Sequence, residues 1–352
     1  MLDLIYFLLC LLSFINIDIK GQNSFYNDYL ELDSANYVKG IFVWMIFFRH
    51  SIEYFKRKDV LNKISLLINN SLDQNIVSLF LFYSGYGINE SYKKKGITYI
   101  KNLPKKSLIL FIKSQIAILF FLLNNILLGI KTSLKRYFLA IIFKKGIGNS
   151  YWFNFTIILL YLYSFFSFIL IKNNNFFSII FINIICYFHI ILVFKYYHQN
   201  IIYSVDTIIC FNIGLYYSLF KFYIDKFIMN NDIYYFGNLL LFILAYYNFY
   251  IAKRKHIYNI ILKNGAFTLI SIILTMKIKL KNEFLNLLNN HSFSIYLFQR
   301  LVMLHILKKG YFKNHMFIKF IFEFLLVIFI AIIFDKYTKF IDNTFKKKDN
   351  KK

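Results

Sequence analysis

The chain has 352 residues, of which 59% are apolar and 21% aromatic, and it carries a formal net charge of +25. Its mean hydropathy of +0.53 is far above what a water-soluble domain tolerates on its surface. These values exclude a soluble enzyme and a disordered chain, and they indicate an integral membrane protein whose first partner is the lipid bilayer. The 42 Lys and Arg residues lie in short clusters between apolar runs, so we expect no nucleic-acid partner.

Apolar runs of helical length follow one another along the whole chain. About 20 apolar residues cross a bilayer as a helix, so each run is a candidate membrane span. The runs cover 2–17, 37–55, 75–89, 107–130, 151–171, 175–195, 201–223, 231–251, 257–277, 289–308 and 316–340. We therefore predict an all-α fold, a polytopic integral membrane helical bundle of about ten core transmembrane helices with one extra N-terminal helix.

Three regions are expected. Residues 1–36 form an extra N-terminal membrane helix and loop, because the first run lacks the basic start and the small-residue cleavage site of a signal peptide. Residues 37–340 form the membrane domain, and 341–352 form a basic cytoplasmic tail. A shorter apolar stretch at 137–143 has basic residues on both sides, which favours an interfacial or re-entrant piece.

Orientation is only weakly marked by charge. Alternate loops hold nearly equal numbers of Lys and Arg, so the positive-inside rule does not decide the topology by count. The two strongest clusters, residues 93–106 and the tail, fall on the same side of the predicted bundle. We assign that side to the cytoplasm of a multi-pass protein in the cell (inner) membrane.

Ionisable residues are concentrated in the run that begins near residue 37, which contains Lys39, Arg49, His50 and Glu53. Such side chains cost roughly 2.5–3.5 kcal/mol each at the centre of a membrane helix, so they are candidates for a functional site. Lys39 and His50 share one helix face roughly 16 Å apart. Glu53 lies one turn beyond Arg49 and His50, where it neutralises the arginine or orients the imidazole. The alternative is an interfacial Arg49–Glu53 ion pair with His50 near the headgroups.

Five short motifs follow one another between about 37 and 340. They are Lys39 with His50 eleven positions later, Ser84-Gly85-Tyr86-Gly87, Trp152-Phe153 with Tyr161, Phe211 with Gly214, and Ser292 with Ile295-Tyr296-Leu297. In this order and spacing they resemble the acyltransferase-3 family of membrane-bound O-acyltransferases that act on carbohydrates. The resemblance implies ten core helices and an acyltransferase-3-like domain over 37–340.

The chain departs from the family pattern at three places. Lys39 stands where many members have Arg, and Gln299 replaces a late His. The family's Arg-x-x-Arg, associated with the phosphates of the acyl donor, is replaced by Lys105-Lys106. The resemblance therefore assigns donor binding to Lys105 and Lys106, and the alternative is that they are a snorkelling cytoplasmic flank.

The resemblance implies transfer of an acyl group, such as acetyl, from acetyl-CoA or another acyl-CoA to a hydroxyl of an envelope or exported glycan or a lipid-linked saccharide. Such a reaction needs a base, stabilisation of an oxyanion and a basic donor site. We assign the base to His50, with Lys39 and Glu53 beside it, and cofactor binding to Arg49, Lys105 and Lys106. We expect no metal, because Cys10, Cys186 and Cys210 have no partner at metal-ligand spacing.

Two other functions stay open at this stage. A saccharide or ion transporter would use Lys39, His50, Glu53 and Asp206 to line a path, although no pair of related halves is visible. A catalytically inactive family member would explain the lost Arg-x-x-Arg and late His. Asp206 is either a functional carboxylate or the partner of Lys221.

Overall fold

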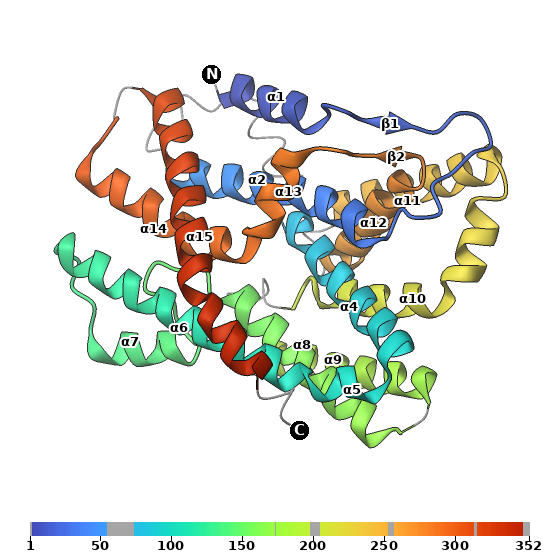
Figure 1. The fold of residues 1–352 in the computed structure, drawn as a ribbon, viewed down its shortest axis with the longest axis horizontal. Coiled ribbons are helices and arrows are strands. Elements are labelled where there is room, and N and C mark those ends of the chain that lie inside the picture. The colour runs from blue at the N-terminus through green and yellow to red at the C-terminus, as the bar shows by residue number, and fades with distance from the viewer. Residues whose placement is uncertain are drawn as a thin grey trace.

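The computed structural model describes residues 2–54, 74–172, 174–197, 205–252, 257–312 and 315–347. Helices account for most of these residues, which confirms the all-α prediction (Figure 1). The helices are α1 Leu2–Ser13, α2 Leu32–Glu53, α4 Asn75–Lys95, α5 Ile97–Lys101, α6 Leu103–Leu127, α7 Leu134–Ile141, α8 Trp152–Leu170, α9 Asn175–Tyr197, α10 Ile208–Ile228, α11 Asp232–Ala252, α12 Ile257–Thr275, α13 Glu283–Asn290, α14 Ser292–Lys309 and α15 Met316–Lys347.

Six helical segments of the described chain are long and apolar enough to cross a membrane. They are Ile97–Leu127, Trp152–Leu170, Asn175–Lys195, Asp232–Ala252, Tyr258–Thr275 and Met316–Thr344. The chain is therefore a membrane protein with several candidate spans. The count of about ten core spans stays a prediction, because α2, α4, α10 and α14 also contain polar and charged residues.

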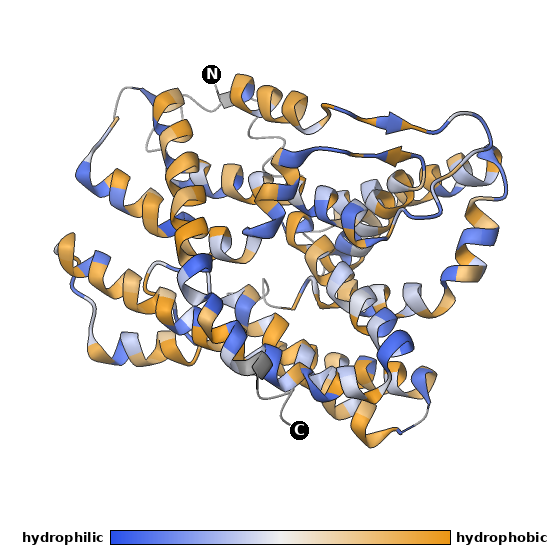
Figure 2. Ribbon diagram, in the orientation of Figure 1, coloured by the Kyte–Doolittle hydropathy of each residue, from blue (hydrophilic) through white to orange (hydrophobic). Residues whose placement is uncertain are grey.

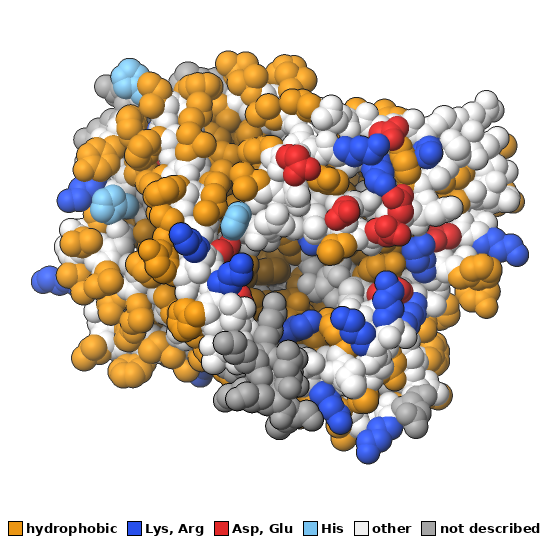
Figure 3. Space-filling model, viewed as in Figure 1, with side chains coloured by type: hydrophobic (Ala, Val, Ile, Leu, Met, Phe, Trp, Pro, Cys, Tyr) orange, Lys and Arg blue, Asp and Glu red, His pale blue; other side chains and the backbone are white. Residues whose placement is uncertain are grey.

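The outer surface is apolar, as a lipid-facing surface must be. In α11 only 6% of the most apolar stretch is buried, and Leu240, Leu241 and Leu244 are each more than half exposed. Figure 2 shows that apolar residues occupy much of every long helix, and Figure 3 shows them covering much of one face of the molecule. Apolar surface costs about 25 cal/mol per Å² in water, so an exposed layer of this extent indicates contact with lipid.

Helix α2 lies at the centre and is packed through glycine. A Cβ atom added at Gly40 would lie 2.2 Å from the carbonyl oxygen of Leu285 in α13. The same holds between α4 and α10, where a Cβ at Gly85 would lie 2.1 Å from Phe211 O and one at Gly214 would lie 2.1 Å from Phe82 O. Two of the five sequence motifs therefore meet at one close helix contact, as glycine allows in membranes.

The N-terminal segment is tied to the bundle. Trp44 Nε1 donates a hydrogen bond to Ser13 Oγ at 2.9 Å. Strand β1, Asp18–Ile19, pairs antiparallel with β2, Ile278–Lys279. An ion pair joins Asp28 to Lys279 beside these strands, and the ammonium group holds the pKa of the Asp28 carboxyl below its usual range.

Two predicted boundaries fall inside helices. Helix α2 begins at Leu32, so the division at 36/37 falls in its second turn, and α15 continues past residue 340 to Lys347. The end of α15 is held by an ion pair between Lys113 of α6 and Asp342 at 3.0 Å. The stretch predicted as an interfacial or re-entrant piece forms α7, whose eight residues are too short to cross a bilayer.

Candidate functional site

A polar cavity of about 290 Å³ lies where the C-terminal end of α2 meets α8 and α14. Its lining includes Arg49, His50 and Glu53 from α2, Trp152 from α8, and Tyr296 and Arg300 from α14. Three of the predicted site residues thus share a cavity with residues from two further sequence motifs.

Arg300 is the residue of this cavity that sequence reasoning missed. Its Nη2 lies 2.7 Å from Nδ1 of His50 and 2.8 Å from Oε2 of Glu53. The available signal was an arginine directly after Gln299, inside a predicted membrane run. The guanidinium holds both partners at once and fixes the imidazole against α14.

The contact with Arg300 determines how the His50 imidazole is protonated in this arrangement. A guanidinium only donates hydrogen bonds, so Nδ1 accepts and the proton of the neutral ring is on Nε2. Glu53 Oε1 lies 3.6 Å from the same Nδ1, which is too long for a hydrogen bond. His50 can therefore donate through Nε2 here, and it can accept a proton at Nδ1 only when Arg300 moves away.

Lys39 lies outside the His50 cavity. Its ammonium is 5.9 Å from the ring centroid of Tyr83 in α4. The residues Lys39, Val43, Ile46 and His50 follow at spacings of four, three and four, so they lie along one face of α2. The structure therefore places Lys39 away from His50 along this face. Of the four predicted site residues of α2, only Arg49, His50 and Glu53 line the same cavity.

A second polar cavity, of about 370 Å³, lies beside Lys106. Lys106, Lys113, Tyr161, Asp335 and Asp342 are among its lining residues. Lys113 pairs with Asp342, and Lys106 lies over the Tyr99 ring, 4.0 Å from its centroid. Figure 3 shows a hollow near the centre of this face with basic side chains around it.

Of the two predicted donor-binding lysines, the structure places Lys106 in this lining and Lys105 outside it. His291, eight residues before Gln299, belongs to this end of the bundle. Its Nδ1 lies 2.6 Å from Oδ2 of Asp335, which is part of the Lys106 cavity. His291 and His50 therefore serve different cavities.

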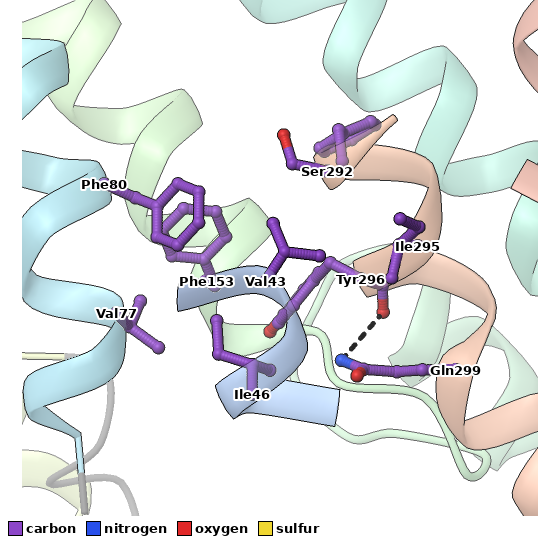
Figure 4. A pocket seen from close by; sticks show the side chains of 10 residues that line it. Val43, Ile46, Val77, Phe80, Phe153, Ser292, Ile295, Tyr296 and Gln299 are labelled. Atoms are coloured by element: carbon purple, nitrogen blue, oxygen red, sulfur yellow. Dashed lines mark hydrogen bonds between the residues drawn. The ribbon is translucent and has the colours of Figure 1, made fainter. Parts of the chain in front are cut away.

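A small apolar space of about 80 Å³ lies between these two regions and has lining residues in common with both. It shares Ile46, Val77 and Tyr296 with the His50 cavity, and it shares Ser292 and Phe293 with the Lys106 cavity. Figure 4 shows Ser292 at one end of this space and Gln299 at the other, with side chains of α2, α4 and α8 between them. The three cavities form one series through the bundle.

Two further expectations are tested by contacts. One of the two alternatives for Asp206 was a pair with a neighbouring lysine such as Lys221; Lys221 itself forms an ion pair with Asp225, four residues later on the same helix. Close helix packing explains Gly85, where an added Cβ would lie 2.1 Å from Phe211 O, but it does not explain Gly87, where a Cβ would meet nothing within 4 Å.

Within the described ranges, no group of three His, Cys, Asp or Glu side chains is arranged to hold a metal ion. Comparisons of the chain with protein-family models, with curated proteins and with solved structures give no match.

Proposed function

We propose that the protein is an acyltransferase-3-like O-acyltransferase of the cell's inner membrane. It moves an acyl group from acetyl-CoA or another acyl-CoA to a hydroxyl of an envelope or exported glycan or a lipid-linked saccharide. One observation carries the proposal: residues of separate sequence motifs gather around one series of cavities. Tyr161 lies at the Lys106 end, Phe153 and Tyr296 lie in the middle, and Trp152 lies with His50 at the other end.

The reaction joins the acceptor oxygen to the thioester carbon and breaks the carbon–sulfur bond. In the proposed reaction His50 takes the hydroxyl proton at Nδ1 and returns it to the departing thiolate of CoA. Before this step Arg300 must move away from Nδ1 of His50. Its guanidinium can remain hydrogen-bonded to Glu53 Oε2, which accepts from it at 2.8 Å. Arg49, in the same cavity, supplies positive charge to the oxyanion of the tetrahedral intermediate.

The donor is assigned to the opposite end of the series. Lys106 has a side chain in the cavity and a position at the start of α6, where its ammonium can meet a phosphate of acyl-CoA. Lys105, beside it in sequence, adds charge near the entrance. Lys39, one turn from Val43 on the same face of α2, supplies a positive charge next to Tyr83.

The proposal is tested by measuring ester groups on the envelope glycans of cells that carry the wild-type chain, no chain, or a variant. His50→Ala should lower the ester at least about 100-fold while the protein level is unchanged, as expected for a positioned acid-base group. The matched control is His305→Ala in α14, because His305 bonds Asn124 Oδ1 at 2.7 Å and lies outside the His50 cavity. Wild-type ester levels with His50→Ala would overturn the assignment.

A further inference from the structure

Four exposed lysines lie at the end of the bundle where α4 is followed by α5. Lys94 and Lys95 are in the last turn of α4, Lys101 is the last residue of α5, and Lys172 follows the end of α8. Figure 1 places α5 at the lower right of the molecule, and Figure 3 shows basic side chains on that part of the face. We call these four residues the α5 lysine cluster.

Helix packing brings Lys172 to this corner from a distant part of the sequence. The ring of Phe168, in the last turn of α8, lies 4.5 Å from the ring of Tyr92, in the last turn of α4. Ile100 of α5 is fully buried in the same apolar cluster as Phe168. The corner is therefore anchored by packed apolar side chains, and its lysines are attached to an ordered frame.

The positive charge of the α5 lysine cluster is not offset by acidic residues. The sequence has no Asp or Glu between Glu90 and Asp206. Glu90, the acid nearest in sequence, is already bound by Lys93 Nζ at 2.8 Å and by Ser218 Oγ at 2.7 Å. None of the four lysines forms an ion pair with a described residue. The cluster therefore favours an anionic partner.

Exposed apolar side chains lie directly next to the cluster. Leu170 is 67% exposed two residues before Lys172, and Phe166 is 52% exposed one turn further into α8. On α6, Leu108 in the second turn is 45% exposed. An apolar surface that is followed by lysines marks the level at which the hydrocarbon of a bilayer ends, where ammonium groups reach the lipid phosphates.

We propose that the α5 lysine cluster binds the headgroups of anionic phospholipids in the leaflet that faces it. The lysines supply the charge, and the exposed side chains of α6 and α8 contact the acyl chains of the same lipids. A lipid fits both features, whereas a soluble phosphate compound would use the lysines alone. The proposal does not depend on acyl transfer, because it concerns the outer surface of the bundle and not its cavities.

The test titrates the full chain in a neutral detergent with phosphatidylglycerol and with phosphatidylcholine of the same acyl chains, and measures binding by native mass spectrometry. Each lysine near a membrane surface strengthens the attraction of anionic lipid about fivefold, so the wild type should bind phosphatidylglycerol at least about tenfold more tightly. This preference should shrink as salt rises from about 0.1 M to about 1 M, because the Debye length falls from about 10 Å to about 3 Å.

Lys94→Gln combined with Lys101→Gln removes two charges and should lower the preference about tenfold or more, whereas the same two residues changed to Arg should retain it. The matched control removes two lysines whose charges an acid offsets. Lys281 pairs with Asp18 at 3.3 Å, and the charge of Lys20 acts on the same carboxylate. Lys20→Gln combined with Lys281→Gln should change the preference less than about twofold.

The unfolding temperature with phosphatidylcholine is the check that each variant is folded. Equal binding of the two lipids by the wild type would overturn the proposal, and so would an unchanged preference in the Lys94→Gln, Lys101→Gln variant. Displacement of phosphatidylglycerol by an equal concentration of glycerol phosphate would also overturn it, because the cluster would then be a site for a soluble phosphate compound.

Discussion

Arg300 makes the chemistry of His50 depend on a side chain of another helix. It holds Nδ1 of His50 and Oε2 of Glu53 with one guanidinium nitrogen. In Arg300→Lys a flexible ammonium replaces the rigid guanidinium, so the cation no longer holds the imidazole before the reaction, and its hydrogen bond to Glu53 is not fixed once it leaves Nδ1. We expect kcat to fall by about 100-fold, the typical cost of a misplaced catalytic group, with KM for acyl-CoA nearly unchanged.

Steady-state kinetics with acetyl-CoA and the isolated glycan acceptor measure both constants. Arg136→Lys is the matched control, since Arg136 is exposed and its Nε bonds only Gly146 O among the contacts described for its side chain. A raised KM with wild-type kcat for Arg300→Lys would instead assign Arg300 to donor binding.

Lys39 is expected to act through its charge alone. Its ammonium lies 5.9 Å from the Tyr83 ring, and either a lysine or an arginine can keep a cation over an aromatic face. Lys39→Arg should therefore retain most of the ester-forming activity, whereas Lys39→Met should lose at least about tenfold because it keeps the side-chain length without the charge. Ester assays on cells with equal protein levels compare the variants, and three equal activities would reduce Lys39 to a packing residue.

At the scale of elements, the contact of α4 with α10 depends on glycine. Gly85→Ala would place a Cβ 2.1 Å from Phe211 O, so the two helices must separate. We expect a loss of about 1–3 kcal/mol in stability, seen as a lower thermal unfolding temperature in detergent. Gly87→Ala is the matched control two residues away, where open space and a gain in helix propensity predict no loss. Equal unfolding temperatures for the two variants would contradict this packing account.

The helices themselves were predictable because a run of about 20 apolar residues has few alternatives to a helix in lipid. Their ends were less predictable, since the Lys113–Asp342 ion pair that extends α15 joins residues far apart in sequence. The partner of Lys221 was predictable in principle, because Asp225 stands at the i, i+4 position that favours an ion pair.

Only the part of the site that lies within one helix was predictable from the sequence. The rule that charged residues in membrane helices are functional identified His50 and Glu53 from their own run. Arg300 reaches them from 250 residues away along the chain, a contact that no local pattern encodes. The motif containing Tyr296 indicated that α14 belongs to the site. The order of the motifs along the chain does not, however, predict which side chains are in contact.

At the scale of the molecule, polarity is arranged in layers. Helices α2, α4 and α14 carry polar groups and line cavities, whereas α9 and α11 expose apolar residues on the outside. Helices α2 and α14 are not among the six candidate spans, and the site residues Arg49, His50, Glu53 and Arg300 are among their ionisable residues. A count of membrane spans by hydropathy therefore leaves out helices that carry the proposed site.

The orientation of this bundle decides whether the Lys106 cavity can meet acyl-CoA. Lys94 lies near the Lys106 end, and Lys144 lies in the segment that leads to the His50 cavity; both are exposed. We predict that Lys144→Cys, made in a chain lacking Cys10, Cys186 and Cys210, is labelled in intact cells by a membrane-impermeant thiol reagent. Lys94→Cys should be labelled only after the membrane is opened, because acyl-CoA is cytoplasmic and cannot cross lipid with its charged phosphates. The reverse pattern would place the proposed donor cavity on the side without acyl-CoA, and the series of cavities would then be better explained as the path of a transporter.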